Sequence, residues 1–135
     1  MAQASKKKVT GFQDLEVYQT LFKLMTIVIT KVLPKLPKEE KFDLVDQTRR
    51  ACKAPSALLA EGFAKRYQKK GWGKYIDDCM GECYEMINHL STIKAVYPAY
   101  CNPESCQKLI DTYDICCKQL TKLKQAWKDY HKNDD

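Results

Sequence analysis

Apolar side chains recur at three- and four-residue steps in four long runs of this sequence, over about residues 13–32, 39–68, 72–97 and 103–131. This spacing places the apolar side chains of each run on one face of an α-helix. Prolines or glycines at 34–37, 71–73 and 98–103 interrupt the pattern. Connections this short make consecutive helices antiparallel neighbours. The sequence therefore predicts an all-α fold, an antiparallel up-down four-helix bundle.

Local signals and chain length refine this prediction. Pro55 lies inside the second run, where its missing N–H predicts a kink. Asn102 precedes Pro103 and Glu104, which is an N-cap pattern for the fourth helix. With 135 residues, of which 44% are hydrophobic, the chain suits one domain with its own core. We expect the bundle to span residues 12–131, with a flexible basic tail at 1–11 and a C-terminal tail at 132–135.

The sequence offers no membrane-spanning or export signal. Its first residues are polar, and no apolar run approaches the ~18 residues needed to cross a bilayer. We therefore expect a soluble, cytoplasmic protein with no membrane partner.

Cysteine is abundant for a protein expected in the cytoplasm. The chain has seven cysteines, an odd number, and no pair of them has the C-x2-C spacing. We expect free thiols that pack as small hydrophobic side chains. Cys79 and Cys83, one helical turn apart, would supply two metal ligands, but no second pair accompanies them. We therefore expect no metal and no cofactor.

The residue patterns of common catalytic sites are missing from the sequence. It contains two histidines, His89 and His131, and no glycine-rich phosphate-binding or nucleophile motif. A di-metal carboxylate site in a four-helix bundle requires Glu-x-x-His on two helices. Glu85 stands four residues before His89, and Lys128 stands three before His131. We name no catalytic residue and expect that the protein is not an enzyme.

Positive charge is concentrated in the second run and in the turn that follows it. The formal net charge of the chain is +6, whereas residues 49–74 alone hold eight Lys or Arg against one acid, Glu61. Aromatic residues are interleaved with these cations. Cations along a surface neutralise phosphates, and exposed aromatic rings stack on unpaired bases. The pattern predicts a surface for RNA or DNA made of Arg49, Arg50, Lys53, Lys65, Arg66, Lys69, Lys70, Lys74, Tyr67 and Trp72.

A second interpretation gives the same residues structural roles. Residues 65–74 would be solvated cations near a helix C-terminus, with the aromatic rings in the core. Arg50 has Asp46 one turn before it and can pair with it. Arg49 would serve an ion pair within the bundle or at a subunit contact. A strip of small side chains beside this face would let another helix approach closely and favour self-association: Ala54, Ser56, Ala57, Ala60 and Ala64.

Three segments resemble a known family. The sequences FQDLEVYQ at 12–19, QTRRAC at 47–52 and AEGF at 60–63 resemble bacterial four-helix-bundle proteins encoded within intervening sequences of 23S ribosomal RNA genes. The resemblance extends over about residues 12–130. The chain departs from the family pattern at Pro55, which replaces a Ser-Ile-Pro-like turn, and at Leu58, which stands where the family has Asn. Its cysteine-rich fourth helix also differs from the family.

The resemblance implies more about fold than about role. The family includes the accessory variability determinant proteins of diversity-generating retroelements, which form basic five-membered rings and bind a reverse transcriptase and its template RNA. It therefore implies a homopentamer that acts as such an accessory protein, with RNA, a reverse transcriptase and its own copies as partners. Two alternatives stay open. One is an orphan protein of the ribosomal intervening sequence, and the other is a pure protein-interaction bundle without nucleic-acid binding.

Overall fold

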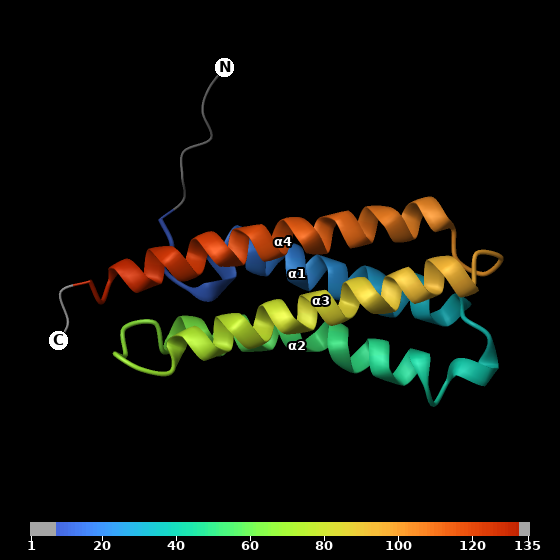
Figure 1. Cartoon of the computed structure of the whole chain (residues 1–135), viewed down its shortest axis with the longest axis horizontal. Coiled ribbons are helices and arrows are strands. Elements are labelled where there is room, and N and C mark those ends of the chain that lie inside the picture. The colour runs from blue at the N-terminus through green and yellow to red at the C-terminus, as the bar shows by residue number, and fades with distance from the viewer. Residues whose placement is uncertain (1–7, 133–135) are drawn as a thin grey trace, which may run out of the picture.

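The computed structural model describes residues 8–132, and in this range every regular element is helical. The long helices are α1 (Glu16–Ile27), α2 (Leu44–Ala64), α3 (Trp72–Val96) and α4 (Pro103–Asp129). The chain runs along the long axis of the molecule in each helix and reverses its direction at each connection (Figure 1). The prediction of an all-α fold with four long helices is confirmed for the described residues. Most of the two predicted tails, at 1–7 and 133–135, lies outside them.

The first apolar run is not one regular helix. After α1 ends at Ile27, the chain continues in a π-helical turn, Val28–Val32, and then in a 3-10 turn, Leu33–Lys35. In the π-helical turn the N–H of Leu33 donates to the carbonyl of Val28, five residues back. Pro34 then stands where a longer helix would need an N–H. The apolar periodicity of the sequence does not distinguish a 3-10 turn or a π-helical turn from an α-helix.

The second helix is shorter than its apolar pattern predicts. A 3-10 turn occupies Lys38–Glu40, and α2 begins at Leu44. At the other end the Lys65 backbone leaves the helical region, with φ −104° and ψ 4°, so the helix ends at Ala64. The prediction that this helix reaches residue 68 is wrong, because residues 65–71 form a connection. Gly71 closes the connection with a φ of +92°, a conformation that glycine adopts without strain.

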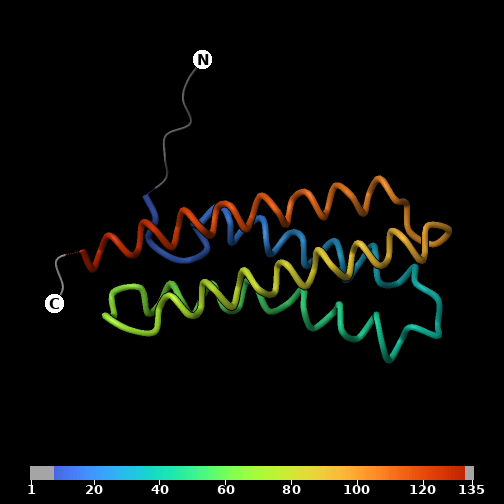
Figure 2. The backbone as a smooth tube through the Cα atoms, viewed as in Figure 1, coloured from blue at the N-terminus to red at the C-terminus, as the bar shows by residue number. Residues whose placement is uncertain are grey.

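Pro55 lies within α2, as predicted. Figure 2 shows the axis of α2 turning near its middle, so that its N-terminal half diverges from α3. Proline has no N–H to donate to the carbonyl of Ala51, one turn earlier. The carbonyl of Pro55 accepts a hydrogen bond from the Cys79 thiol, with 3.2 Å between the two atoms. The bend is therefore tied directly to α3.

The predicted N-cap of the fourth helix is confirmed. The side-chain oxygen of Asn102 accepts hydrogen bonds from the backbone N–H groups of Glu104 and Ser105, at 2.8 and 3.1 Å. Pro103 occupies the first helical position, where its missing N–H costs nothing. A cap of this kind stabilises a helix by about 1 kcal/mol.

The core is formed by the apolar faces of the helices, as the periodicity predicts. Each fully buried Leu or Ile side chain contributes roughly 1.5–3 kcal/mol. The largest fully buried side chains are Leu21 and Val28 near the N-terminus, Leu59 of α2, Ile76, Met86, Leu90 and Ile93 of α3, and Tyr113 and Leu120 of α4.

All seven cysteines are free and buried, as predicted. Burial raises the pKa of the Cys52 thiol to about 11 and that of Cys116 to about 12. No group of three or more His, Cys, Asp or Glu side chains in residues 8–132 is arranged to hold a metal ion. Within the same range, no helix combines the length and apolarity needed to cross a bilayer.

The thiols lead to a first prediction. We expect none of the seven cysteines to react rapidly with an aromatic disulfide reagent at mildly alkaline pH in the folded protein. The thiolate is the reactive form, and burial disfavours it. Every cysteine should react once the protein is unfolded in denaturant. The measurement is the absorbance of the released thiolate with time, and a rapid phase in the folded protein would contradict the burial of the cysteines.

Candidate nucleic-acid interface

The predicted binding residues lie in two separate places. Arg49, Arg50 and Lys53 are exposed on α2, and the other seven lie in the connection 65–71 and the first turn of α3. The helix rise places Arg49 about 22 Å from the end of α2 at Ala64. The ten residues therefore do not form one continuous site.

Arg50, one of the three cations on α2, faces acidic side chains. Arg50 pairs with Asp46 at 2.7 Å, as predicted, and both side chains stay largely exposed. Arg50 also lines a shallow cavity of about 430 Å³ together with Glu82 and Glu85 of α3. Partial burial, followed by the neighbouring Glu85 carboxylate, raises the pKa of Glu82. Carboxylates beside Arg50 disfavour a phosphate there, so Arg50 is a weaker candidate than an unpaired lysine.

Lys65 and Arg66 are bound to neutral groups of the same chain. The Lys65 ammonium donates a hydrogen bond to the Tyr75 hydroxyl at 2.6 Å, which raises the pKa of Lys65. The Arg66 guanidinium donates to the carbonyl of Phe63 at 2.7 Å. It also lies over two rings, 3.7 Å from the centre of Phe63 and 4.3 Å from that of Tyr67. Both side chains are held by these contacts, so they position the connection and are not free phosphate ligands.

Three lysines around the connection are open to solvent. Lys69, Lys70 and Lys74 are exposed, and the ion pairs in residues 8–132 involve none of them. Asp77, one turn after Lys74, pairs with Lys124 of α4 at 2.7 Å. These three ammonium groups are therefore available to an anion from outside the subunit.

Trp72 does not belong to this surface. Its side chain is only 8% exposed, and its ring packs edge-on against Trp127 and stacks on His131, with centroids 6.3 and 5.8 Å apart. His131 also forms a hydrogen bond with the carbonyl of Arg66, at 2.8 Å. The prediction that Trp72 stacks on a base is wrong, because this ring holds the end of α4 against the start of α3.

The sequence predicted Tyr67 as an exposed aromatic residue of this surface, but it did not predict its stacking partner, Tyr130. Tyr67 and Tyr130 stack with their ring centroids 5.4 Å apart and their planes at 26°. Their side chains are 67% and 50% exposed. Tyr130 follows α4 and lies between two further exposed lysines, Lys128 and Lys132. Asp129, the acid between them, accepts a hydrogen bond from Gln125.

These residues define one surface, which we call the basic end. Figure 1 shows the connection after α2 and the C-terminal end of α4 at the same end of the bundle. The basic end consists of the Tyr67–Tyr130 stack and five exposed lysines: Lys69, Lys70, Lys74, Lys128 and Lys132. It offers flat rings for bases next to point charges for phosphates, which is the chemistry that single-stranded nucleic acids need.

Comparison with known proteins identifies the family. A family model described as 23S rRNA-intervening sequence protein matches residues 13–122, from the turn before α1 into α4. Neither curated proteins nor solved structures give a match. The matched range covers most of the chain and includes two of the three resembling segments, at 47–52 and 60–63, and all but the first residue of the third, at 12–19. The chain belongs to the 23S rRNA-intervening sequence protein family.

Proposed function

We propose that this protein is a non-catalytic scaffold that binds single-stranded nucleic acid at the basic end. Unpaired bases stack on the exposed face of the Tyr67–Tyr130 pair, and phosphates bind Lys69, Lys70 and Lys74. One observation carries the proposal: two exposed, stacked rings and three lysines without a carboxylate partner among the described residues lie at the same end of the bundle. Stacking of this kind contributes about 1–3 kcal/mol per base and depends little on base identity.

The proposal extends to assembly and role. We propose a homopentameric ring of up-down bundles that acts in a diversity-generating retroelement, where it binds the template RNA and the reverse transcriptase. A ring would multiply the basic ends and raise the avidity for one RNA strand. The support is the cationic and aromatic stretch at 65–75.

A protein-interaction bundle without nucleic-acid binding is the second candidate function. The α2–α3 surface favours it, because Arg50, Glu82 and Glu85 line one shallow cavity. This mixture of charges suits a partner protein or a second subunit better than it suits a polyanion.

A salt series tests the nucleic-acid proposal. Fluorescence anisotropy with labelled single-stranded RNA and DNA of one sequence, and with the matching duplex, gives the binding constant at each salt concentration. For single strands the logarithm of the constant should fall with a slope of about −0.7 per phosphate contact, or roughly −2 for three lysines. Single strands should bind more tightly than the duplex, because only their bases can stack. Absence of binding at low salt, or binding that salt does not weaken, would contradict the proposal.

The stacking contact leads to a second prediction. Replacing Tyr67 with Ala should weaken binding of single-stranded RNA by about 5- to 100-fold, because the Tyr67–Tyr130 stack that receives a base is broken. Tyr67→Phe keeps the ring and should bind almost as the native protein does. Tyr84, which is 57% exposed on α3, supplies the control variant Tyr84→Ala. Equal losses in Tyr67→Ala and Tyr84→Ala would show that stacking at the basic end is not involved.

A further inference from the structure

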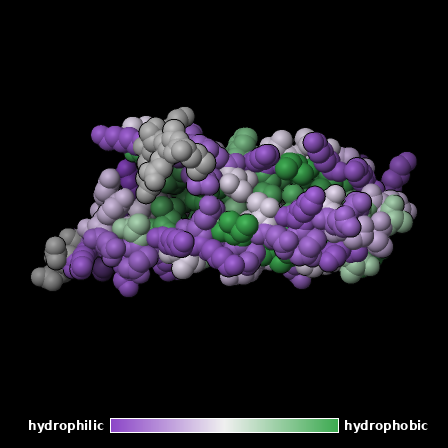
Figure 3. All heavy atoms as spheres, turned by 90° about the horizontal axis from the view of Figure 1, so that it is seen from above, coloured by the Kyte–Doolittle hydropathy of each residue, from purple (hydrophilic) through white to green (hydrophobic). Residues whose placement is uncertain are grey.

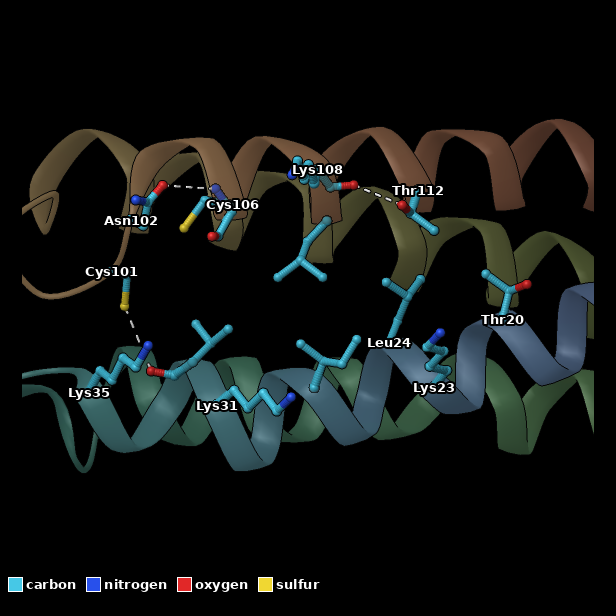
Figure 4. A pocket seen from close by; sticks show the side chains of 14 residues that line it. Thr20, Lys23, Leu24, Lys31, Lys35, Cys101, Asn102, Cys106, Lys108 and Thr112 are labelled. Carbon is cyan, nitrogen blue, oxygen red and sulfur yellow. Dashed lines mark hydrogen bonds between the residues drawn. The ribbon is translucent and has the colours of Figure 1, made fainter.

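A cleft runs between α1 and the first half of α4. It has a volume of about 560 Å³, within the range of ligand-binding sites. One side is formed by α1 and the turns that follow it, and the other by residues 101–112 (Figure 4). The 97–103 connection beside the cleft lies at the opposite end of the bundle from the connection 65–71 (Figure 1). The cleft is therefore separate from the basic end.

The floor of the cleft is apolar. Leu24, Val32 and Leu109 line it, each of them at most 8% exposed, and the partly buried Ile27 lies among them. In Figure 3, hydrophobic atoms are visible between hydrophilic side chains in the half of the molecule away from the grey N-terminal trace. The lining contains no aromatic side chain. The floor thus offers aliphatic surface that another aliphatic group would cover.

The rim of the cleft carries only positive charge. Lys23, Lys31 and Lys35 come from the α1 side and Lys108 from α4, as Figure 4 shows. All four are exposed, and none takes part in the ion pairs of the described residues. No Asp or Glu lines the cleft. Four ammonium groups around an aliphatic floor are complementary to an occupant that is acidic at its edges and apolar on its face.

The π-helical turn helps to shape the cleft. It supplies Lys31 and Val32 to the lining, and π-helical turns are frequent at functional sites. The carbonyl of Val32 accepts a hydrogen bond from the thiol of Cys101, at 3.7 Å, which ties this turn to the chain before α4. The hydroxyls of Thr20 and Thr112 bond to carbonyls of their own helices, at 3.1 and 2.8 Å. The lysines are thus the main polar groups left for a ligand.

We propose that this cleft binds an acidic amphipathic helix of a partner protein. Leucine-like side chains at helical spacing would cover the floor, and flanking carboxylates would meet the lysines, as in other helix-in-groove complexes. Lys23 to Lys35 spans roughly 18 Å of helical rise, so a single carboxylate or phosphate reaches one or two of the four lysines. A nucleic acid would leave the aliphatic floor without a matching surface. The occupant therefore has several negative charges and an apolar face.

Binding of a designed peptide tests this proposal. The probe is a fluorescent peptide of about five helical turns, ~18 residues, with a stripe of leucines flanked by glutamates. A second peptide of the same composition has the leucines scattered around the helix. Fluorescence anisotropy should show binding of the striped peptide and at least tenfold weaker binding of the scattered one.

Variants of the protein locate the binding site. Ser105 is exposed and lines the cleft, so Ser105→Trp should fill it and abolish binding, with circular dichroism to confirm folding. Lys31→Glu with Lys35→Glu should weaken binding at least tenfold. Lys118→Glu with Lys122→Glu changes the net charge equally outside the cleft and should not affect binding. Lys69→Glu with Lys70→Glu, at the basic end, should also have no effect, which separates this proposal from nucleic-acid binding.

Several outcomes would overturn the proposal. Equal binding of the two peptides would show that the cleft does not recognise an apolar stripe. Absence of binding of the striped peptide would show that the cleft does not bind an acidic amphipathic helix. If Ser105→Trp folds and still binds, the peptide occupies another surface. If a long-chain fatty acid or single-stranded RNA binds in the cleft and the striped peptide does not, the site belongs to that other ligand.

Discussion

Replacing Lys69, Lys70 and Lys74 together with glutamate is expected to lower the affinity for single-stranded RNA roughly a hundredfold at low salt. Each lysine is exposed and has no carboxylate partner among the described residues, so reversal replaces an attraction to phosphate with a repulsion. The salt dependence should change as well. Loss of three phosphate contacts should make the slope less steep by about 2.

A variant with the same net charge distinguishes local contacts with RNA from the overall electrostatic attraction between the protein and RNA. Reversing Lys38, Lys118 and Lys122 changes the net charge by the same amount, and all three are exposed outside the basic end. If the basic end is the contact surface, this control should lose little affinity and keep its salt slope. Equal losses in both triple variants would mean that RNA responds to net charge alone. Both are measured by the anisotropy titration over the same salt series.

The sequence contains most of the information about the fold. Helical periodicity, the proline and glycine breaks and the cap at Asn102 predict the α3 and α4 boundaries within a few residues of those observed. The sequence does not predict where the first and second helices end. In the first run, apolar spacing continues through a π-helical turn and a 3-10 turn. In the second run, α2 stops at Ala64, where the Lys65 backbone leaves the helical region. Backbone hydrogen bonds, which the apolar pattern does not record, decide where each α-helix stops.

The basic end was only partly predictable. The charge cluster at 65–74 is visible in the sequence. Whether Trp72 or Tyr67 is exposed, however, depends on tertiary packing, which the sequence pattern does not show. Trp72 is covered because α4 ends beside it and supplies Trp127 and His131. A signal for Tyr130 did exist. In an up-down bundle the end of the second helix meets the end of the fourth, so aromatic and basic residues near 130 belong to the same surface.

The cleft between α1 and α4 gave no signal in the sequence. Its lysines are spread from residue 23 to residue 108, and only the closeness of the two helices makes them one rim. Its floor consists of aliphatic side chains that the sequence pattern does not distinguish from core side chains. A space between two helices depends on how far apart packing holds them, which a pattern within each helix does not record.

Packing at Gly62 leads to the prediction with the largest expected effect on stability. Gly62 belongs to the Ala-Glu-Gly signature and is buried where α2 meets α3 and α4. A Cβ atom there would lie 3.0 Å from the Cβ of Tyr75, and within 3.7 Å of Ile76 and Trp127. The Tyr75 Cβ is fixed to its backbone, so the helices themselves must move apart. We expect Gly62→Leu to lower the free energy of unfolding by about 3 kcal/mol.

Gly81 supplies the control, because it is an exposed glycine in α3 with no atom within 4 Å of an added Cβ. Leucine is a better helix former than glycine, so Gly81→Leu should raise the free energy of unfolding by about 0.5–1 kcal/mol. The same substitution thus changes stability in opposite directions at two helical glycines, and urea unfolding followed by circular dichroism measures both. If Gly62→Leu proves as stable as the native protein, α2 and α3 are not held at this distance. The geometry of the hydrogen bond from Lys65 to Tyr75, one turn beyond Gly62, depends on the same spacing. If that spacing is not fixed, the shape of the basic end is not fixed either.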